Sequence, residues 1–180
     1  MQIDVARSTD VDRIVELVND AYRGTSRAPG WTHETHLFAG ARVEPAAVTK
    51  LIQPDRSTVL VMRHDGAIIA CVALERLDDS EWYLSMLAVD PARQTSGAGK
   101  AIMAGAERFA RERGAERMRI SVINLRDSLI AWYERQGYVR TGAVEAVPDD
   151  PTIGRPLRSD LALITLTKSL SESPTYEGSL

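Results

Sequence analysis

The chain has 180 residues, 44% of them hydrophobic and 26% charged, and its formal net charge is −3 at pH 7. This length suits one well-packed domain, so we expect a single domain over 1–170 and a flexible polar tail over 171–180. The weakly acidic balance argues against nucleic-acid binding. No segment reads as a secretion leader or a membrane span, so we expect a cytoplasmic protein without a membrane partner.

The few cysteines and histidines limit the disulfides and metal sites that the chain can form. The single cysteine, Cys71, excludes an internal disulfide and a cysteine-rich zinc site. It lies in the apolar run 67–74, which predicts a small core residue. His33 and His36 are three residues apart, but no third ligand accompanies them, and we expect no metal site.

The first half of the chain predicts a strand, several helices and a β-hairpin. In chain order these are a strand at 2–6, a helix from Thr9 or Asp10 to about Gly24, a short helix capped by Thr32, a helix from Pro45 to about Ile52, and strands at 57–63 and 67–76 around the turn 64–66.

The second half alternates strands and helices. In chain order we expect a strand at 81–89, a helix at 97–113, a strand at 116–123, a helix at 127–136, a strand at 137–141, a loop at 143–159 and a last strand at 160–168. The segment 81–89 is apolar on both faces, which is typical of a central strand covered on both sides. The order predicts a mixed α/β (α+β) fold with helices on both faces of one sheet.

A glycine-rich turn joins the buried strand 81–89 to the long helix. Such a turn presents backbone N–H groups at the positive end of a helix, and Gly97 and Gly99 allow phosphate oxygens to approach closely. The Walker pattern fails here because Ala101 follows Gly99-Lys100 and Gln94 takes the first glycine position. The dinucleotide pattern fails because Ile102 takes its third glycine position. The segment 94–99 fits the pattern [RQ]-x-x-G-x-[GA], although an ordinary turn without a ligand has similar composition.

Two motifs together resemble the GNAT acetyltransferase superfamily. The segment 84–91, Leu-Ser-Met-Leu-Ala-Val-Asp-Pro, is similar to the family's fourth strand, and 94–99 is similar to its pyrophosphate loop. The segment 128–138, with Tyr133-Glu134 before Gly137-Tyr138, resembles its second signature. The resemblance covers about 81–142 and implies a mostly antiparallel mixed sheet whose fourth and fifth strands splay apart.

The resemblance also implies acetyl-CoA as cofactor and assigns residues to it. The expected set is Leu87, Ala88, Val89, Gln94, Thr95, Ser96, Gly97, Ala98, Gly99, Lys100 and Arg126. Two members depart from the family pattern. Thr95 stands where the family often has glycine, and would be strained if that position required a positive φ. Arg126 stands where the family often has asparagine, so the role of that asparagine is not carried over.

Acetyl transfer to an amine requires a base for the ammonium and an acid for the leaving thiolate. The resemblance places Tyr133 near the CoA sulfur and implies that it is the general acid. Without the resemblance, a core tyrosine on an apolar helix face is the ordinary interpretation. Glu75 and Glu81, at the ends of neighbouring strands, are candidates for a base acting through water. A surface ion pair is the alternative for each.

The substrate region implied by the family lies after the first helix and in the last hairpin loop. The candidates there are Trp31, Glu34, Arg155 and Arg158. The expected function is transfer of an acetyl group to a primary amine of a small molecule. The alternatives are a protein N-terminal or lysine acetyltransferase and a non-catalytic CoA-binding module. A homodimer is common in the family.

Overall fold

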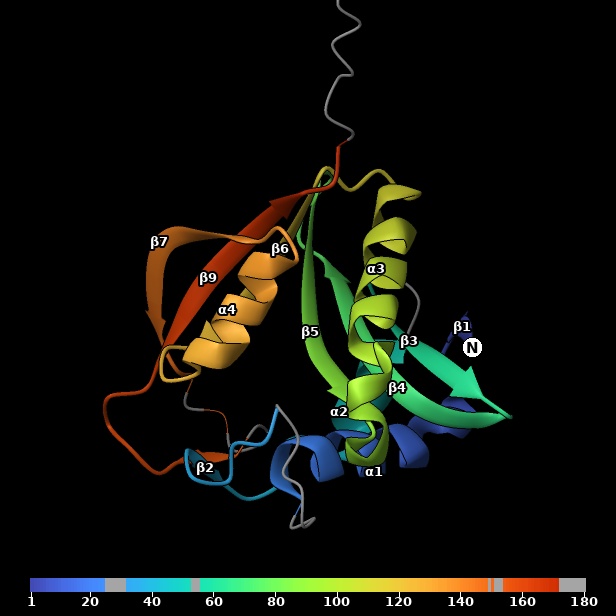
Figure 1. Cartoon of the computed structure of the whole chain (residues 1–180), viewed down its shortest axis with the longest axis horizontal. Coiled ribbons are helices and arrows are strands. Elements are labelled where there is room, and N and C mark those ends of the chain that lie inside the picture. The colour runs from blue at the N-terminus through green and yellow to red at the C-terminus, as the bar shows by residue number, and fades with distance from the viewer. Residues whose placement is uncertain (25–31, 53–55, 149, 151–153, 172–180) are drawn as a thin grey trace, which may run out of the picture.

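A seven-stranded sheet with the order β1-β3-β4-β5-β6-β9-β7 forms the centre of the protein (Figure 1). The computed structural model describes residues 1–24, 32–52, 56–148, 150 and 154–171. The expected tail, apart from residue 171, therefore lies outside the described residues. The elements are β1 (Gln2–Val5), η1 (Ser8–Asp10), α1 (Val11–Arg23), β2 (Phe38–Ala39), α2 (Pro45–Ile52), β3 (Ser57–His64), β4 (Ala67–Arg76), β5 (Glu81–Val89), η2 (Pro91–Ser96), α3 (Ala98–Arg111), β6 (Arg117–Ile123), α4 (Asp127–Arg135), β7 (Val139–Ala146), β8 (Arg155–Pro156) and β9 (Ala162–Ser169).

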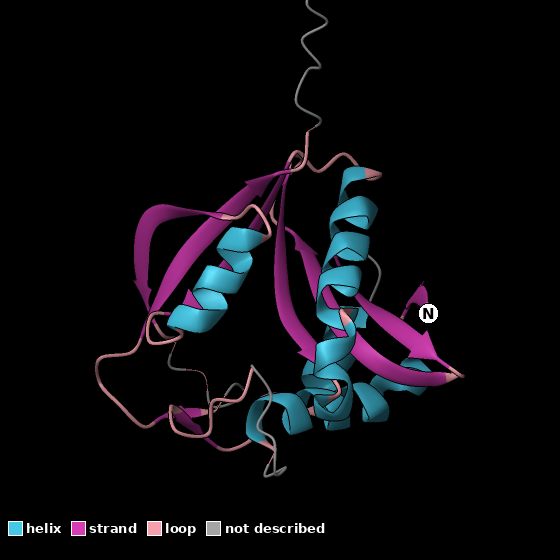
Figure 2. Ribbon diagram, viewed as in Figure 1, coloured by secondary structure: helices cyan, strands magenta, loops and turns pink. Residues whose placement is uncertain are grey.

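The sheet is mixed and mostly antiparallel, as expected. Within it, β5 and β6 pair in parallel and every other neighbouring pair is antiparallel. Helices cover both faces (Figure 2). Apolar residues of α1 and α2 form one core cluster with β3, β4 and β5, and those of α3 and α4 form another on the opposite side. No helix in the described part of the chain is long and apolar enough to cross a membrane.

The amphipathic pattern of α1 explains its place in the fold. Ile14, Leu17, Val18 and Ala21 recur at helical spacing and are fully buried against the sheet, while the opposite face of the helix is polar. Cys71 is also fully buried in this cluster, so the prediction of a core cysteine is confirmed. Burial raises the pKa of its thiol to about 12.

Two sequence-based predictions of local structure were wrong. Thr32 does not cap a helix, because its hydroxyl donates to the Ala21 carbonyl at the end of α1 and turns follow instead. The expected strand at 137–141 continues to Ala146 as β7, since β9 offers it a partner as far as Ala162. Part of the expected loop 143–159 is therefore strand, and β8 pairs with the short strand β2. These pairings depend on tertiary contacts that local patterns do not encode.

The central strands separate partway along their length. The parallel pairing of β5 with β6 joins Glu81, Trp82 and Tyr83 to residues 117–119 and ends there. Beyond Tyr83 the two strands diverge, with α3 beside β5 and α4 beside β6 (Figure 1). The family resemblance implied that its fourth and fifth strands splay apart, and in this chain those two strands are β5 and β6. Their separation provides the space for the site.

Candidate active site

A bulge in β5 lies beside the divergence of the two strands. The register with β4 shifts between Cys71 and Ala73, and Met86 adopts a positive φ of 53°. The Cys71 thiol donates weakly to the Met86 carbonyl, with a sulfur–oxygen distance of 3.9 Å, so that carbonyl faces β4. A trans peptide directs its N–H opposite to its C=O. The bulge therefore directs the Leu87 N–H away from the Cys71 side chain, and Leu87 lines the space between the diverging strands.

The glycine-rich turn forms one wall of a cavity of about 350 Å³ beside the start of α3. Gly97 ends η2 in the left-handed region, at φ 78°, and precedes the first residue of α3. The first N–H groups of a helix have no partner within it, and the helix dipole adds positive potential there. Gly97, Gly99 and Lys100 all line the cavity. Thr95 lies within η2, and the left-handed conformation falls on Gly97 instead.

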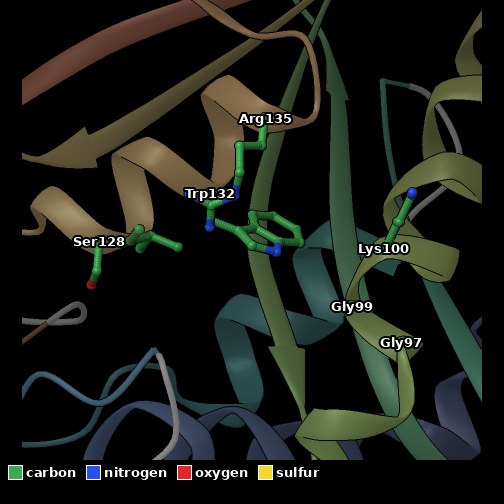
Figure 3. Close-up of a pocket in the computed structure, with 7 residues that line it drawn as sticks. Gly97, Gly99, Lys100, Ser128, Trp132 and Arg135 are labelled. Carbon is green, nitrogen blue, oxygen red and sulfur yellow. The ribbon is translucent and has the colours of Figure 1, made fainter.

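The opposite wall of this cavity, called the phosphate-side cavity below after the ligand that we propose for it, comes from α4. Ser128, Leu129, Trp132 and Arg135 line it, and Trp132 projects from α4 towards the first turn of α3 (Figure 3). Lys100 and Arg135 place a positive charge on each wall. The sequence-based interpretation did not assign these α4 residues. Their spacing of three and four residues places them on one face of a helix, but that spacing does not indicate that this face turns towards α3.

A second cavity, of about 310 Å³, lies between the diverging strands and is called the acceptor cavity below, after the substrate that we propose for it. Leu129 lines both cavities, so they adjoin at α4. The lining includes Leu87 of β5 and Tyr133 of α4. The described residues that complete it are Tyr22, Glu34, Phe38, Arg42, Tyr83, Leu84, Ser85, Met86, Ile120, Ser121, Val122, Ile123, Arg126, Val147, Pro148 and Leu163.

Tyr133 is a buried residue that also contributes to the lining of the acceptor cavity. The ring meets Trp132 and Tyr138 edge to face, with centroids 5.0 and 5.6 Å away, and the side chain is 7% exposed. Burial raises its pKa well above 10, and nearby Tyr22 adds to the effect. The group is therefore a neutral phenol at physiological pH. No residue in the described part of the chain hydrogen-bonds its hydroxyl.

Tyr22 connects α1 to the bulge. Its hydroxyl donates to the Leu87 carbonyl at 2.9 Å, which holds the peptide group between Leu87 and Ala88 in place. Burial raises the pKa of Tyr22 to about 12, so it remains a donor across the physiological range. Sequence analysis did not assign Tyr22 to the site, because α1 and β5 are joined only by the tertiary fold.

Glu34 is the one carboxylate among the described residues that line the acceptor cavity. Arg23 donates to its Oε1 at 2.5 Å, and the Arg126 Nη1 lies 3.5 Å from its Oε2. Arg126 also donates to the Thr32 carbonyl at 3.1 Å. Arg126, expected beside the cofactor, thus lines the acceptor cavity and contacts Glu34, which was expected at the substrate.

The structure does not bring the other candidates together. Glu81 pairs with Arg117 and Arg119, at 3.3 and 2.5 Å, where β5 and β6 are still joined, and lines neither cavity. Glu75 also lines neither cavity, but it lies directly opposite Tyr83, which does.

The expected substrate residues of the last hairpin loop are also dispersed. Arg155 is exposed in β8, and Arg158 is exposed in a pair with Asp160 at 2.6 Å. Neither lines a cavity described above. Trp31 lies outside the described residues, as do the side chains of Gln94 and Thr95. Ser96 is exposed, and its hydroxyl donates to the Arg93 carbonyl at 2.6 Å.

A mixed sheet split between two parallel strands, with a glycine-led helix beside the split, defines an acyltransferase fold of the GNAT type. The Acetyltransferase (GNAT) family profile matches residues 11–138, and the chain belongs to this family. An uncharacterized N-acetyltransferase of Mycobacterium tuberculosis is 29% identical over 105 residues, which are 58% of this chain and 67% of that protein.

Solved structures share the fold across almost the whole chain. An N-acetyltransferase from Staphylococcus aureus superposes with a TM-score of 0.71 at 14% identity, covering 94% of this chain and 97% of that one. A ribosomal-protein-alanine N-acetyltransferase from Brucella melitensis gives a TM-score of 0.68 at 19% identity, covering 94% and 99%. The chain is therefore an enzyme of the acyltransferase class with the GNAT fold.

Proposed function

We propose that the protein transfers the acetyl group of acetyl-CoA directly to a primary amine of a small molecule. One observation carries this proposal. The phosphate-side cavity at the start of α3 and the acceptor cavity between β5 and β6 adjoin at Leu129, with Tyr133 and the Leu87 N–H beside the second. A donor and an acceptor entering from the two cavities would therefore meet without a covalent enzyme intermediate.

The residues of the phosphate-side cavity fit the pyrophosphate of CoA. The N–H groups of the first turn of α3 provide hydrogen-bond donors, and Lys100 and Arg135 provide countercharge. A Cβ added at Gly97 would meet no atom within 4 Å, so the turn is open towards a ligand. Acetyl-CoA held there would supply an acetyl thioester for direct transfer to the amine, with the CoA thiolate as the leaving group.

Two groups of the chain support that exchange. The Leu87 N–H belongs to the bulge, and Tyr22 contacts the Leu87 carbonyl; this N–H would donate to the acetyl oxygen as negative charge develops there. Tyr133 is neutral because its pKa is raised by burial, so its hydroxyl holds a proton for the departing sulfur. The ammonium proton leaves in the opposite direction, to solvent.

Glu75 is the stronger candidate for assisting that deprotonation. It is half-buried and faces Tyr83 across β4 and β5, so water between them would reach the acceptor cavity. Glu81 already faces two arginines at the joined end of the strands, and we propose a structural role for it.

The size of the acceptor cavity favours a small molecule over a polypeptide. A volume of about 310 Å³ lies at the lower end of the range for small-molecule sites. Phe38 from the β2–β8 side and Pro148 after β7 both contribute to its lining, which limits the space for an extended chain. A peptide acceptor remains the second candidate, because structural relatives include a ribosomal-protein-alanine N-acetyltransferase.

The test is acetyl transfer from acetyl-CoA over two matched panels, small primary amines and short peptides, with products identified by mass. We expect small amines to gain one acetyl group and peptides to react poorly. Faster transfer to peptide N-termini or lysines would move the function to the second candidate. Saturable CoA binding without transfer to either panel would identify a non-catalytic CoA-binding module.

A further inference from the structure

The acceptor cavity has an unequal balance of charge. Its described lining contains two arginines, Arg42 and Arg126, and one carboxylate, Glu34. Arg23 lies just behind Glu34 and donates to its Oε1 at 2.5 Å. Among the described contacts, Glu34 is thus approached by three guanidinium groups. An ordinary amine, which is itself a cation when it arrives, gains little from such a lining unless it also carries negative charge.

Arg42 is the arginine whose charge is least compensated by these contacts. Its Nε is 3.9 Å from the Glu34 Oε1, too far for a hydrogen bond, and that oxygen already accepts from Arg23. Its guanidinium lies over the Tyr22 ring, 5.1 Å from the ring centroid. Within the described part of the chain it has no other carboxylate partner, and its side chain is 24% exposed. Stacking on an aromatic ring orients the planar donor fork.

Tyr22 sets the distance between this guanidinium and the reacting atoms. Arg42 lies over the ring of Tyr22, and the hydroxyl of the same side chain donates to the Leu87 carbonyl at 2.9 Å. The positive group and the Leu87 carbonyl therefore contact the same tyrosine side chain, one over its ring and the other at its hydroxyl. An acceptor whose amine reaches Leu87 and whose other end reaches Arg42 must be a short molecule with an amine at one end and an anion at the other.

We propose that the acceptor is a small amine that also carries a carboxylate, such as an amino acid, and that Arg42 binds this carboxylate. This inference rests on the proposed function and specifies the substrate class. Arginine is suited to the task because its fork donates two parallel hydrogen bonds to a carboxylate. The carboxylate takes no part in the reaction and positions the amine beside the Leu87 N–H and Tyr133.

The experiment compares amines that differ only in that charge. Acetyl transfer is measured for γ-aminobutyrate against its amide and for leucine against leucinamide, with rates expressed per neutral amine. We expect kcat/KM to be about 10- to 100-fold higher for the carboxylate of each pair, the factor that a charge-assisted hydrogen bond supplies.

Variants separate recognition of the carboxylate from a general effect on folding. Arg42→Gln should abolish the preference for the carboxylate, lowering kcat/KM for the acid of each pair more than for its amide. Arg42→Lys keeps the charge without the fork and should retain part of the preference. Arg76→Gln is the matched control, because Arg76 is exposed, pairs with exposed Asp79 and lines neither cavity. It should leave the preference intact.

The outcomes distinguish this inference from the proposed function. Equal kcat/KM for acids and amides in the wild type would overturn the inference while leaving the N-acetyltransferase intact. A loss of equal size for both members of a pair in Arg42→Gln would also overturn it, because it would indicate a structural role. Transfer to neither member, with CoA still bound, would contradict the proposed function and the inference together.

Discussion

Replacing Tyr133 with phenylalanine isolates the role of one hydroxyl. The ring would keep its edge contacts with Trp132 and Tyr138, and no described residue would lose a hydrogen bond. Stability should therefore change by less than about 1 kcal/mol. If the hydroxyl supplies the proton to the departing sulfur, the chemical step should slow by about 10² to 10⁴. That factor corresponds to about 3 to 5 kcal/mol in the activation free energy.

The assay is single-turnover acetyl transfer, measured together with CoA affinity and thermal unfolding. Tyr138→Phe is the matched control, since Tyr138 belongs to the same aromatic cluster but donates to the Glu107 Oε1 at 3.1 Å. It should lose about 1 to 3 kcal/mol of stability with little change in rate. An unchanged single-turnover rate in Tyr133→Phe would refute the assignment, and another group would have to donate the proton.

Three further outcomes are expected. Gly97→Val should weaken CoA binding at least about tenfold, because a β-branched residue is strained at the Gly97 φ of 78°. Gly114→Val is the control, since Gly114 has a φ of 91° and equally open surroundings, and its CoA affinity measured by calorimetry should be unchanged. Glu75→Gln should slow acetyl transfer about 10- to 100-fold. Glu81→Gln should lower the free energy of unfolding in denaturant by about 1 to 3 kcal/mol and leave the transfer rate unchanged. The reverse pattern would exchange the roles of the two residues. Activity should rise with pH towards the amine pKa of about 10.4, with no fall below about pH 10, because burial raises the pKa of Tyr133 and keeps the acid protonated.

The phosphate-side cavity was largely predictable because its signals are local. The buried strand, the glycine-rich turn and the following helix are contiguous, so the pattern singled out Gly97 and Gly99. The family resemblance added Lys100, and all three line one cavity. Trp132 and Arg135 were missed although their helical spacing was visible. Nothing in the sequence says which face of α4 turns towards α3, since that depends on packing.

The acceptor cavity was far less predictable. Tyr22 and Arg42 come from the first quarter of the chain. Tyr22 meets Leu87 only because α1 packs against β5, and Arg42 lies over the Tyr22 ring. Arg126 was assigned by its position relative to a family motif, and position alone did not reveal that its side chain contacts Glu34. Arg158 satisfies its charge with Asp160, two residues away, which a loop sequence without side-chain geometry does not indicate.

The central claim is that the donor and the acceptor meet between β5 and β6. A crystal structure of the protein with CoA and a primary amine tests this claim most directly. We expect the pyrophosphate on the first turn of α3 beside Gly97 and Gly99, and the CoA sulfur between the Leu87 N–H and the Tyr133 hydroxyl with the amine in the acceptor cavity. A CoA molecule bound elsewhere, or a sulfur remote from both groups, would contradict the proposed mechanism.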